Sequence, residues 1–264
     1  MNRTELLGLG GRTRSGRILI LASLLFGAFG LAGASRAWGA TASVDEVVAG
    51  ILANAARVGN FECVVNCRAL NRGANGRVLQ DISQRRHFWC DRAAGLVRDE
   101  YEDGSGIRDL YDGKAKKWKR RSPKMNAEEA LPVAVSSMSD LWPSPKFVYF
   151  PAELFDSYNL EVVGAVGNKV RLTGRIKGDA PASRTHAEFE VDAKKGIILS
   201  VSLYGPSGDL IQRIRLRDYK NFKGCWLPTR ILDRRNAQNN AVDVDMTYDM
   251  KSINEVTPNA FTLQ

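Results

Sequence analysis

The feature that most constrains the fold is a strict alternation of apolar and polar side chains along short segments in the second half of the chain. In residues 187–192 three apolar residues alternate with three acidic ones, and in 242–249 four apolar residues alternate with three aspartates and a threonine. The same period of two recurs along four further segments: 160–166, 170–176, 199–203 and 213–217. This period places apolar groups on one face of a β-strand and polar groups on the other. The pattern therefore predicts an antiparallel sheet with one apolar and one solvated face.

The first half of the chain adds a helix and further strands. Residues 43–57 carry an apolar stripe at helical spacing, and Ser43 with Glu46 forms a capping-box pattern at its start. The remaining elements are predicted strands at 61–69, 78–89, 96–101, 107–111 and 116–120 and a helical insert at 126–141. A twisted sheet of about eleven strands curls instead of staying flat. We therefore expect a mainly β (α+β) fold, a strongly curved antiparallel incomplete β-barrel lidded by the N-terminal helix and the insert.

The N-terminal segment is typical of a secretory signal peptide. Arg12, Arg14 and Arg17 precede a charge-free apolar run over residues 18–34, and small-residue sites follow near 39–42. The alternative, an uncleaved membrane anchor, requires about 20 apolar residues, whereas this run has 17 residues and contains three glycines. We expect residues 1–40 to be cleaved off, residues 41–264 to form a single domain, and the mature protein to be periplasmic.

Charge and motif content narrow the function classes. Removal of residues 1–40 takes away five arginines and one glutamate, which lowers the formal net charge from +9 to +5. Nucleic-acid-binding proteins usually concentrate more Lys and Arg on one face. The sequence lacks the motifs of phosphate-binding loops, zinc proteases and serine hydrolases, and it has two histidines. We expect a binding protein and not an enzyme, with no cofactor, no metal and no nucleic acid.

The four cysteines suggest disulfides. Cys63, Cys67, Cys90 and Cys225 form an even count in an exported chain, which favours two disulfides with three possible connectivities. Cys63 and Cys67 are four residues apart on one predicted strand, roughly 13 Å at ~3.3 Å per residue, so each is expected to reach Cys90, Cys225 or a partner. A zinc site of Cys63, Cys67, His87 and Cys90 has the right number of ligands, but strand alternation points His87 away from Cys90.

The apolar sheet face supplies the candidate ligand-binding residues. A fatty chain gains ~0.8 kcal/mol for each buried CH₂, and a concave apolar face can provide that burial without a charged group. The alternative for each side chain is ordinary core packing. The candidates are Val65, Phe88, Val170, Leu172, Phe189, Leu199, Val201, Ile214, Leu216, Val244 and Met246.

The polar face carries one basic row. Arg213, Arg215 and Arg217 point to the same side of a predicted strand. One interpretation is a solvated face whose arginines meet the aspartates of segment 242–249 on a neighbouring strand. The other is a docking patch for an acidic partner or for lipid headgroups.

The segment 218–231 resembles outer-membrane lipoprotein-sorting proteins of the LolA-like group. In that pattern a strand ends in Asp-Tyr, a short Gly turn follows, and Trp226-Leu227-Pro228-Thr229 opens the next strand. The strand-then-turn step at 110–114, the hairpin turn at 204–209 and the closing segment 257–261 fit in the expected order. The resemblance covers essentially the whole of residues 41–264.

The resemblance implies a half-barrel of the LolA, LolB and RseB type. Its members hold lipoprotein acyl chains or other lipids, or sense mislocalised lipoproteins. It implies a periplasmic carrier or chaperone whose partners are a lipid or an acylated lipoprotein, with an inner- or outer-membrane protein as a further possible partner. The alternatives are an envelope sensor and an unrecognised hydrolase. Arg92 corresponds to the family's release arginine, although an Asp precedes it and the family's Pro is absent. The cysteines are not part of the family pattern.

Overall fold

The computed structural model describes residues 42–112, 117–123, 129–130, 151–178, 184–237 and 240–262. The predicted signal peptide lies outside these residues, as does most of the predicted insert at 126–141. Within the described part of the chain, no helix is both long and apolar enough to cross a membrane.

The described residues form strands with a few short helices. The helices are α1 (Val44–Ala56), α3 (Pro151–Phe155) and the 3-10 helix η2 (Pro258–Phe261). The strands are β1 (Asn60–Gly73), β2 (Val78–Asp91), β3 (Leu96–Tyr101), β4 (Arg108–Asp112), β5 (Lys117–Arg121), β6 (Glu129–Ala130), β7 (Tyr158–Val166), β8 (Lys169–Ile176), β9 (His186–Asp192), β10 (Ile197–Tyr204), β11 (Leu210–Phe222), β12 (Cys225–Ala237) and β13 (Asn240–Ile253).

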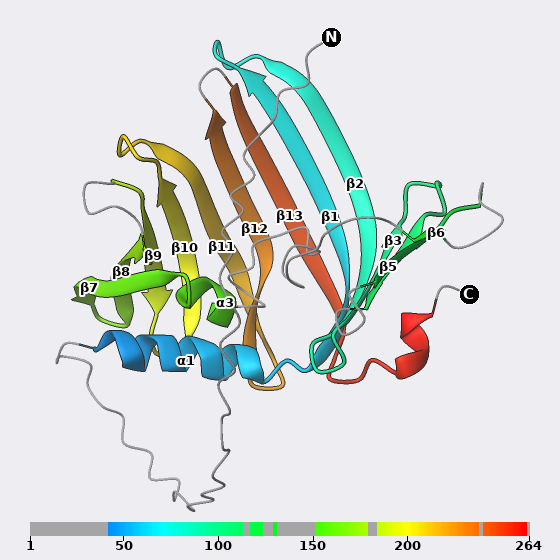
Figure 1. Cartoon of the computed structure of the whole chain (residues 1–264), viewed down its shortest axis with the longest axis horizontal. Helices are drawn as coiled ribbons and strands as arrows, with labels where there is room; N and C mark the ends of the chain where they lie inside the picture. Colours follow the sequence, from blue (N-terminus) through cyan, green and yellow to red (C-terminus); the bar gives the residue numbers. More distant parts are fainter. Residues whose placement is uncertain are drawn as a thin grey trace, which may run out of the picture. The chain divides into compact units, whose positions relative to one another are not determined.

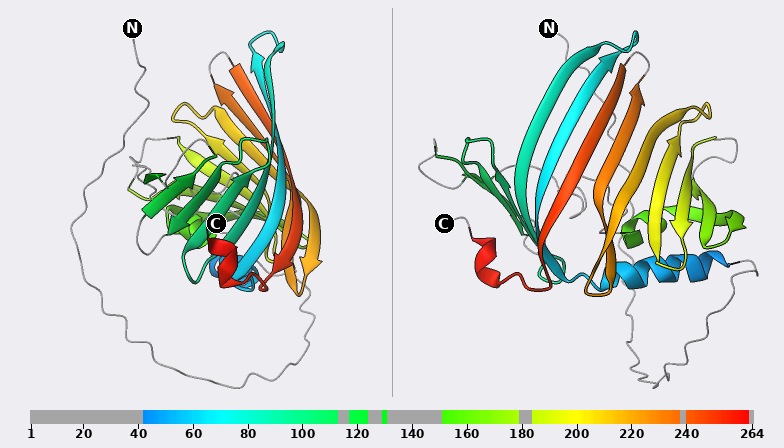
Figure 2. Two further views of the ribbon diagram at one scale, coloured as in Figure 1. Left: turned by 90° about the vertical axis from the view of Figure 1, so that its right-hand side faces the viewer. Right: turned by 180° about the vertical axis from the view of Figure 1, so that it is seen from behind.

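All of these strands belong to one antiparallel sheet. The order is β6-β5-β4-β3-β2-β1-β13-β12-β11-β10-β9-β8-β7, so the last strand returns to pair with the first at the centre. The sheet is strongly curved (Figures 1 and 2), and its two end strands, β6 and β7, do not pair with each other, so the described sheet stays open. The predicted fold class, a curved and incomplete antiparallel barrel, is confirmed.

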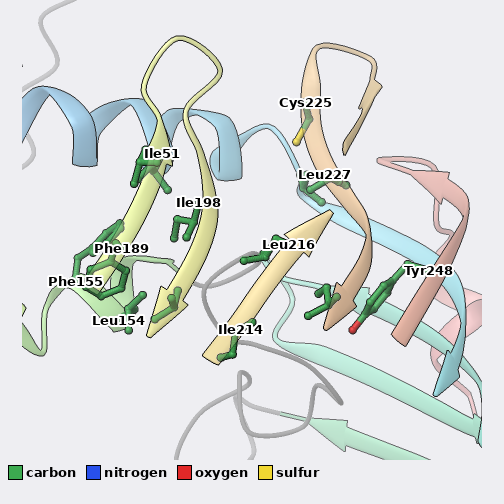
Figure 3. Close-up of a cluster of buried hydrophobic side chains, with 14 of the residues drawn as sticks. Ile51, Leu154, Phe155, Phe189, Ile198, Ile214, Leu216, Cys225, Leu227 and Tyr248 are labelled. Atoms are coloured by element: carbon green, nitrogen blue, oxygen red, sulfur yellow. The ribbon is translucent and has the colours of Figure 1, made fainter. Parts of the chain in front are cut away.

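One face of the sheet, which we call the inner face, carries the core. Register places Phe61, Val65, Ile214 and Phe189 on this face, and Phe155 of α3 packs against Phe189 with ring centroids 6.0 Å apart. Ile51 of α1 joins the same cluster beside Ile198 and Leu216 (Figure 3). The opposite, outer face carries most of the charged side chains of the strands.

Helix α1 begins as its sequence predicts and lies across the lower ends of the strands (Figure 1). The Ser43 hydroxyl accepts a hydrogen bond from the Glu46 backbone at 3.2 Å, and the Glu46 carboxylate accepts one from the Ser43 backbone at 3.1 Å, which confirms the capping box. Gly196, in the turn before β10, has φ +63° and lies against the backbone of Gly50. A side chain at position 196 would push the helix away from the sheet.

Asn54 fastens α1 to the sheet through a buried amide. Its Nδ2 donates to the carbonyl of Trp226 at 2.9 Å, and its Oδ1 accepts from the Trp226 amide at 2.9 Å. Asn54 is 8% exposed, so few water molecules can replace these partners. The side-chain amide therefore pairs with the backbone of Trp226 as a neighbouring strand would, and it links the helix to β12.

An Asn54→Leu variant is expected to lose about 2 kcal/mol of the free energy of unfolding, because it strands a buried donor and acceptor of Trp226. Urea unfolding measures the loss. Ala53→Leu, at the adjacent exposed position of α1, controls for the added leucine and is expected to change stability by less than about 0.5 kcal/mol. Equal effects of the two changes would contradict the assigned role of Asn54.

Two elements differ from the sequence expectation. Period-two alternation predicts about eleven strands, whereas the described residues form a sheet of 13. Strand β12 has no clean alternation because it contains Pro228, which pairs with Tyr219 of β11 at the end of the strand that β13 does not reach. There the missing amide hydrogen leaves no ladder bond unmade. The expected helical insert is corrected at its only described residues, Glu129–Ala130, which pair with β5 as strand β6.

Candidate ligand-binding face

Most of the predicted ligand-binding residues meet in the packed core of the inner face. Each of the following is at most 2% exposed: Val65, Phe88, Val170, Leu172, Phe189, Val201, Ile214, Leu216 and Met246. Alternation therefore placed these side chains together on the apolar face of the sheet. In the structure these side chains pack against one another and against α1 and α3 (Figure 3).

The remaining two predicted residues lie differently. Leu199 falls at a register shift between Ile198 and Ser200, and Ile198 takes the buried position in the core cluster while Leu199 is half-buried. Val244 of β13 is also half-buried, and it packs at the border of the core. Its cross-strand neighbours are Ala69 of β1 and Asp233 of β12.

Val244 belongs to an apolar extension of the inner face toward the β1–β2 hairpin. The extension, which we call the inner-face strip, consists of Cys67, Ala69, Ile82, Val242 and Val244. Ile82 is 42% exposed and the other four are half-buried. The described helices pack on other strands, α1 on β7, β10 and β12 and η2 on β3. The strip is therefore apolar surface that continues the core without sharing its close packing.

Charged groups border the inner-face strip at both sides. On the β2 side, Arg86 pairs with Asp99 and its guanidinium lies over the rings of Phe88 and Tyr101, at 4.9 and 4.5 Å from their centroids. On the β11 side, Asp233 is 4% exposed and accepts hydrogen bonds from the Gln212 amide at 2.9 Å and Arg235 Nε at 3.0 Å. An apolar strip between these polar groups suits an amphiphilic ligand.

A second buried carboxylate lies next to Asp99. Asp109 of β4 is the cross-strand partner of Asp99 and accepts two hydrogen bonds from Arg120, at 2.7 and 2.8 Å. Asp99 and Asp109 are 6% and 3% exposed. Sequence reasoning missed this inner-face row. The sequence did contain one indication of it. Asp99 lies between Val97 and Tyr101 at a position that alternation assigns to the apolar face of the strand.

Arg92 lies at the end of α1. Its Nη1 donates to the carbonyls of Ala55 at 2.6 Å and Val58 at 3.0 Å. The Ala55 carbonyl belongs to the last turn of α1, where a positive charge is favourable, and Val58 lies just beyond the helix. The contacts give Arg92 a structural task, the attachment of α1 to the end of β2.

The disulfide expectation is corrected by the structure, in which all four cysteines are free thiols. Cys63 and Cys90 are buried on the inner face of adjacent strands, and Cys225 donates to the carbonyl of Asn54 at 3.3 Å. Burial raises the pKa of Cys90 to about 12 and that of Cys225 to about 11, and it holds the pKa of Cys63 well above its ordinary value. At neutral pH these thiols are therefore protonated.

The zinc alternative fails on geometry in the described residues. His87 lies on the outer face, where its Nε2 is 2.7 Å from Glu62 Oε1 and its ring stacks on Trp89 at 3.8 Å. The thiols of Cys63 and Cys90 point to the opposite face of the sheet. Among the described residues, no group of three potential ligands could hold a metal ion.

The open curved sheet, the helix across its strand ends and the apolar inner face define a half-barrel. No protein-family model matches the sequence, and no curated protein matches it in sequence. The fold, in contrast, has solved counterparts.

Three solved structures share the architecture. A LolA superfamily protein from Nitrosomonas europaea aligns with a TM-score of 0.52 and 14% identity over 84% of this chain and 98% of that one. A DUF1329 family protein from Desulfovibrio piger aligns with a TM-score of 0.53 and 12% identity over 84% and 98%. An outer membrane lipoprotein-sorting protein domain from Vibrio parahaemolyticus aligns with a TM-score of 0.52 and 12% identity over 81% and 95%. The chain therefore has the LolA-type fold, which confirms the resemblance found in the sequence.

Proposed function

We propose that this protein is a periplasmic carrier that binds an amphiphile, a lipid or the acyl chains of a lipoprotein, along the inner-face strip. The observation that carries the proposal is the strip itself, half-exposed apolar surface that continues the core of a LolA-type half-barrel and ends at charged groups. The acyl chain lies on Ala69, Ile82 and Val244, and the polar head lies toward Arg86 or Arg235.

The expected energetics suit transport. Burial of about ten methylene groups gains roughly 8 kcal/mol at ~0.8 kcal/mol each. The cost of association and ordering offsets part of this gross gain. The proposal requires no catalytic group, and we assign the protein no enzymatic activity.

The test is native mass spectrometry of protein purified gently after export, followed by organic extraction of the bound material. We expect a stoichiometric lipid or acylated peptide. Ile82→Asp is expected to lower its occupancy at least about tenfold, because a carboxylate on the strip displaces at least two methylene contacts, roughly 1.6 kcal/mol.

The control is Ser83→Asp, which adds the same charge one residue away on the outer face of β2. It is expected to leave occupancy unchanged. A clean apo mass in every preparation would contradict carriage. It would favour the second candidate, an envelope module that binds a protein partner, for which the exposed apolar tip of the β1–β2 hairpin is the supporting observation, with Leu79 60% exposed.

A further inference from the structure

The outer face of β11 and β12 concentrates arginines that the neighbouring strands do not balance. Cross-strand register places Arg213 directly opposite Arg234, and Arg217 directly opposite Arg230, with Arg215 between them opposite Leu232. Like charges in directly opposed positions destabilise a sheet. Two such pairs on adjacent strands therefore lower the stability of the sheet.

The nearby carboxylates are occupied by other partners. Asp245 accepts two hydrogen bonds from Arg230, at 3.0 and 2.7 Å, and Asp243 accepts one from Arg72 at 2.9 Å. Asp243 also lies 3.7 Å from Arg234. The aspartates of β13 thus balance β12 and β1, and β12 separates them from β11. The sequence interpretation in which they meet the basic row of β11 is therefore wrong.

On its other side β11 faces a neutral strand. Ser200 and Ser202 of β10 are the cross-strand partners of Arg215 and Arg213. Arg213 Nε lies 3.4 Å from the Ser202 hydroxyl. Within the part of the chain that the structure describes, Arg215 and Arg217 have no ion-pair partner.

The same arginines border a recess. A groove of about 620 Å³ is lined by Arg213, Arg215 and Arg234. Its other charged residues include Arg68, Arg72 and the paired carboxylates Asp243 and Asp245, and its apolar residues include Leu70 and Leu232. A second hollow of about 300 Å³ adjoins it toward β8 and shares Arg213 and Arg215, and Arg171, Glu188 and Glu190 also line it. The surplus charge therefore lies beside a concave surface with apolar patches, which is the composition of a binding site.

We propose that this outer groove docks an extended acidic segment of a partner protein, a function separate from ligand carriage on the inner face. Side chains two residues apart on a strand are about 6.8 Å apart, so alternate carboxylates of an extended peptide match the spacing of Arg213, Arg215 and Arg217. Each guanidinium can hold a carboxylate through two parallel hydrogen bonds. Because side chains alternate along an extended chain, the residues between these carboxylates point away from the arginines toward solvent.

The groove favours a peptide over an anionic membrane. A flat lipid surface cannot enter a recess, and it would also face the acidic outer rows of β9 and β13, which include Glu188, Glu190 and Asp249. An extended chain that lies along β11 reaches the arginines directly, and the β13 aspartates that share the groove are already paired with Arg72 and Arg230.

The test uses a fluorescein-labelled peptide with alternating Asp and Leu and a matched peptide with Asn in place of Asp. Fluorescence anisotropy with purified protein at low salt is expected to show at least tenfold tighter binding of the Asp peptide, and 0.5 M NaCl is expected to abolish the difference. Arg213→Gln/Arg215→Gln is expected to weaken binding at least tenfold. Lys177→Gln/Lys194→Gln, which removes two exposed charges elsewhere, is expected to change it less than twofold.

Several outcomes would overturn the proposal. Equal binding of the two peptides, or an equal effect of the two double variants, would show that the arginine row is only a solvated surface. Binding to phosphatidylglycerol vesicles without binding to the Asp peptide would assign the face to lipid. If the arginine double variant does not fold, Arg215→Gln alone, at an exposed side chain without an ion-pair partner, gives the same comparison.

Discussion

An Asp99→Ala variant is expected to lose about 3–5 kcal/mol of the free energy of unfolding, because it leaves the charge of Arg86 unpaired in a buried site. The Arg86 side chain is 17% exposed and that of Asp99 is 8% exposed. Arg86 Nε donates to Asp99 Oδ1 at 3.2 Å, and the second guanidinium nitrogen also contacts the carboxylate. The rings of Phe88 and Tyr101 occupy the space through which water would otherwise solvate the charge.

The double variant Arg86→Met/Asp99→Leu distinguishes the energetic contribution of the ion pair from the contribution of side-chain packing at the same positions. Replacement of both partners by apolar residues is expected to restore most of the loss, since a buried ion pair is often worth no more than a packed apolar pair. Asp81→Ala, which removes the carboxylate of the exposed Arg68–Asp81 pair, is the matched control and is expected to have little effect. A loss below about 1 kcal/mol for Asp99→Ala would show that water reaches Arg86.

The sheet could be predicted because its strands have one buried and one exposed face, which appears in the sequence as alternating apolar and polar residues. In β9 and β13 every second residue is apolar, and both strands form where the alternation predicts them. Strand β12 could not be found this way, because Pro228 and the run from Asp233 to Asn236 interrupt the period. Only the resemblance of residues 226–229 to a strand opening indicated it.

The site was harder to predict because alternation gives the face of a residue and not its depth. Val170 and Val244 have the same pattern in the sequence, yet Val170 is 1% exposed and Val244 is half-buried at the inner-face strip. The difference arises from where α1 and α3 pack on the curved sheet, which depends on contacts between distant segments such as Asn54 with Trp226. Ile82 was overlooked for the same reason.

The basic row illustrates the same limit for charges. The sequence shows arginines at 213, 215 and 217 and aspartates in the segment 242–249, and their opposite signs suggest that they pair. Strand order prevents this pairing, because β12 lies between β11 and β13 and its Arg230 binds Asp245. Sequence patterns predict which side chains share a face, whereas strand order determines which of them are neighbours.

Above pH 9 the protein is expected to lose stability steeply, because its buried thiols resist ionisation. Burial raises the pKa of Cys90 to about 12, whereas a thiol in the unfolded chain ionises near pH 9. Between these values the folded state holds a proton that the unfolded state releases, so the stabilising contribution is complete below pH 9 and is lost as the pH rises toward 12. Each pH unit costs ~1.4 kcal/mol per retained proton, about 4 kcal/mol in total for Cys90.

Urea unfolding at intervals from pH 8 to 10.5, with a phosphine reductant present, measures this slope. Cys90→Val is expected to flatten it by about 1.4 kcal/mol per pH unit, since it removes one of the retained protons. Cys67→Val is the matched control, because Cys67 is only half-buried on the inner-face strip and its pKa is less strongly raised. An unchanged slope in Cys90→Val would contradict the buried free thiol. A slope that flattens in wild type when the reductant is omitted would show that oxidation joins thiols that are free in the structure.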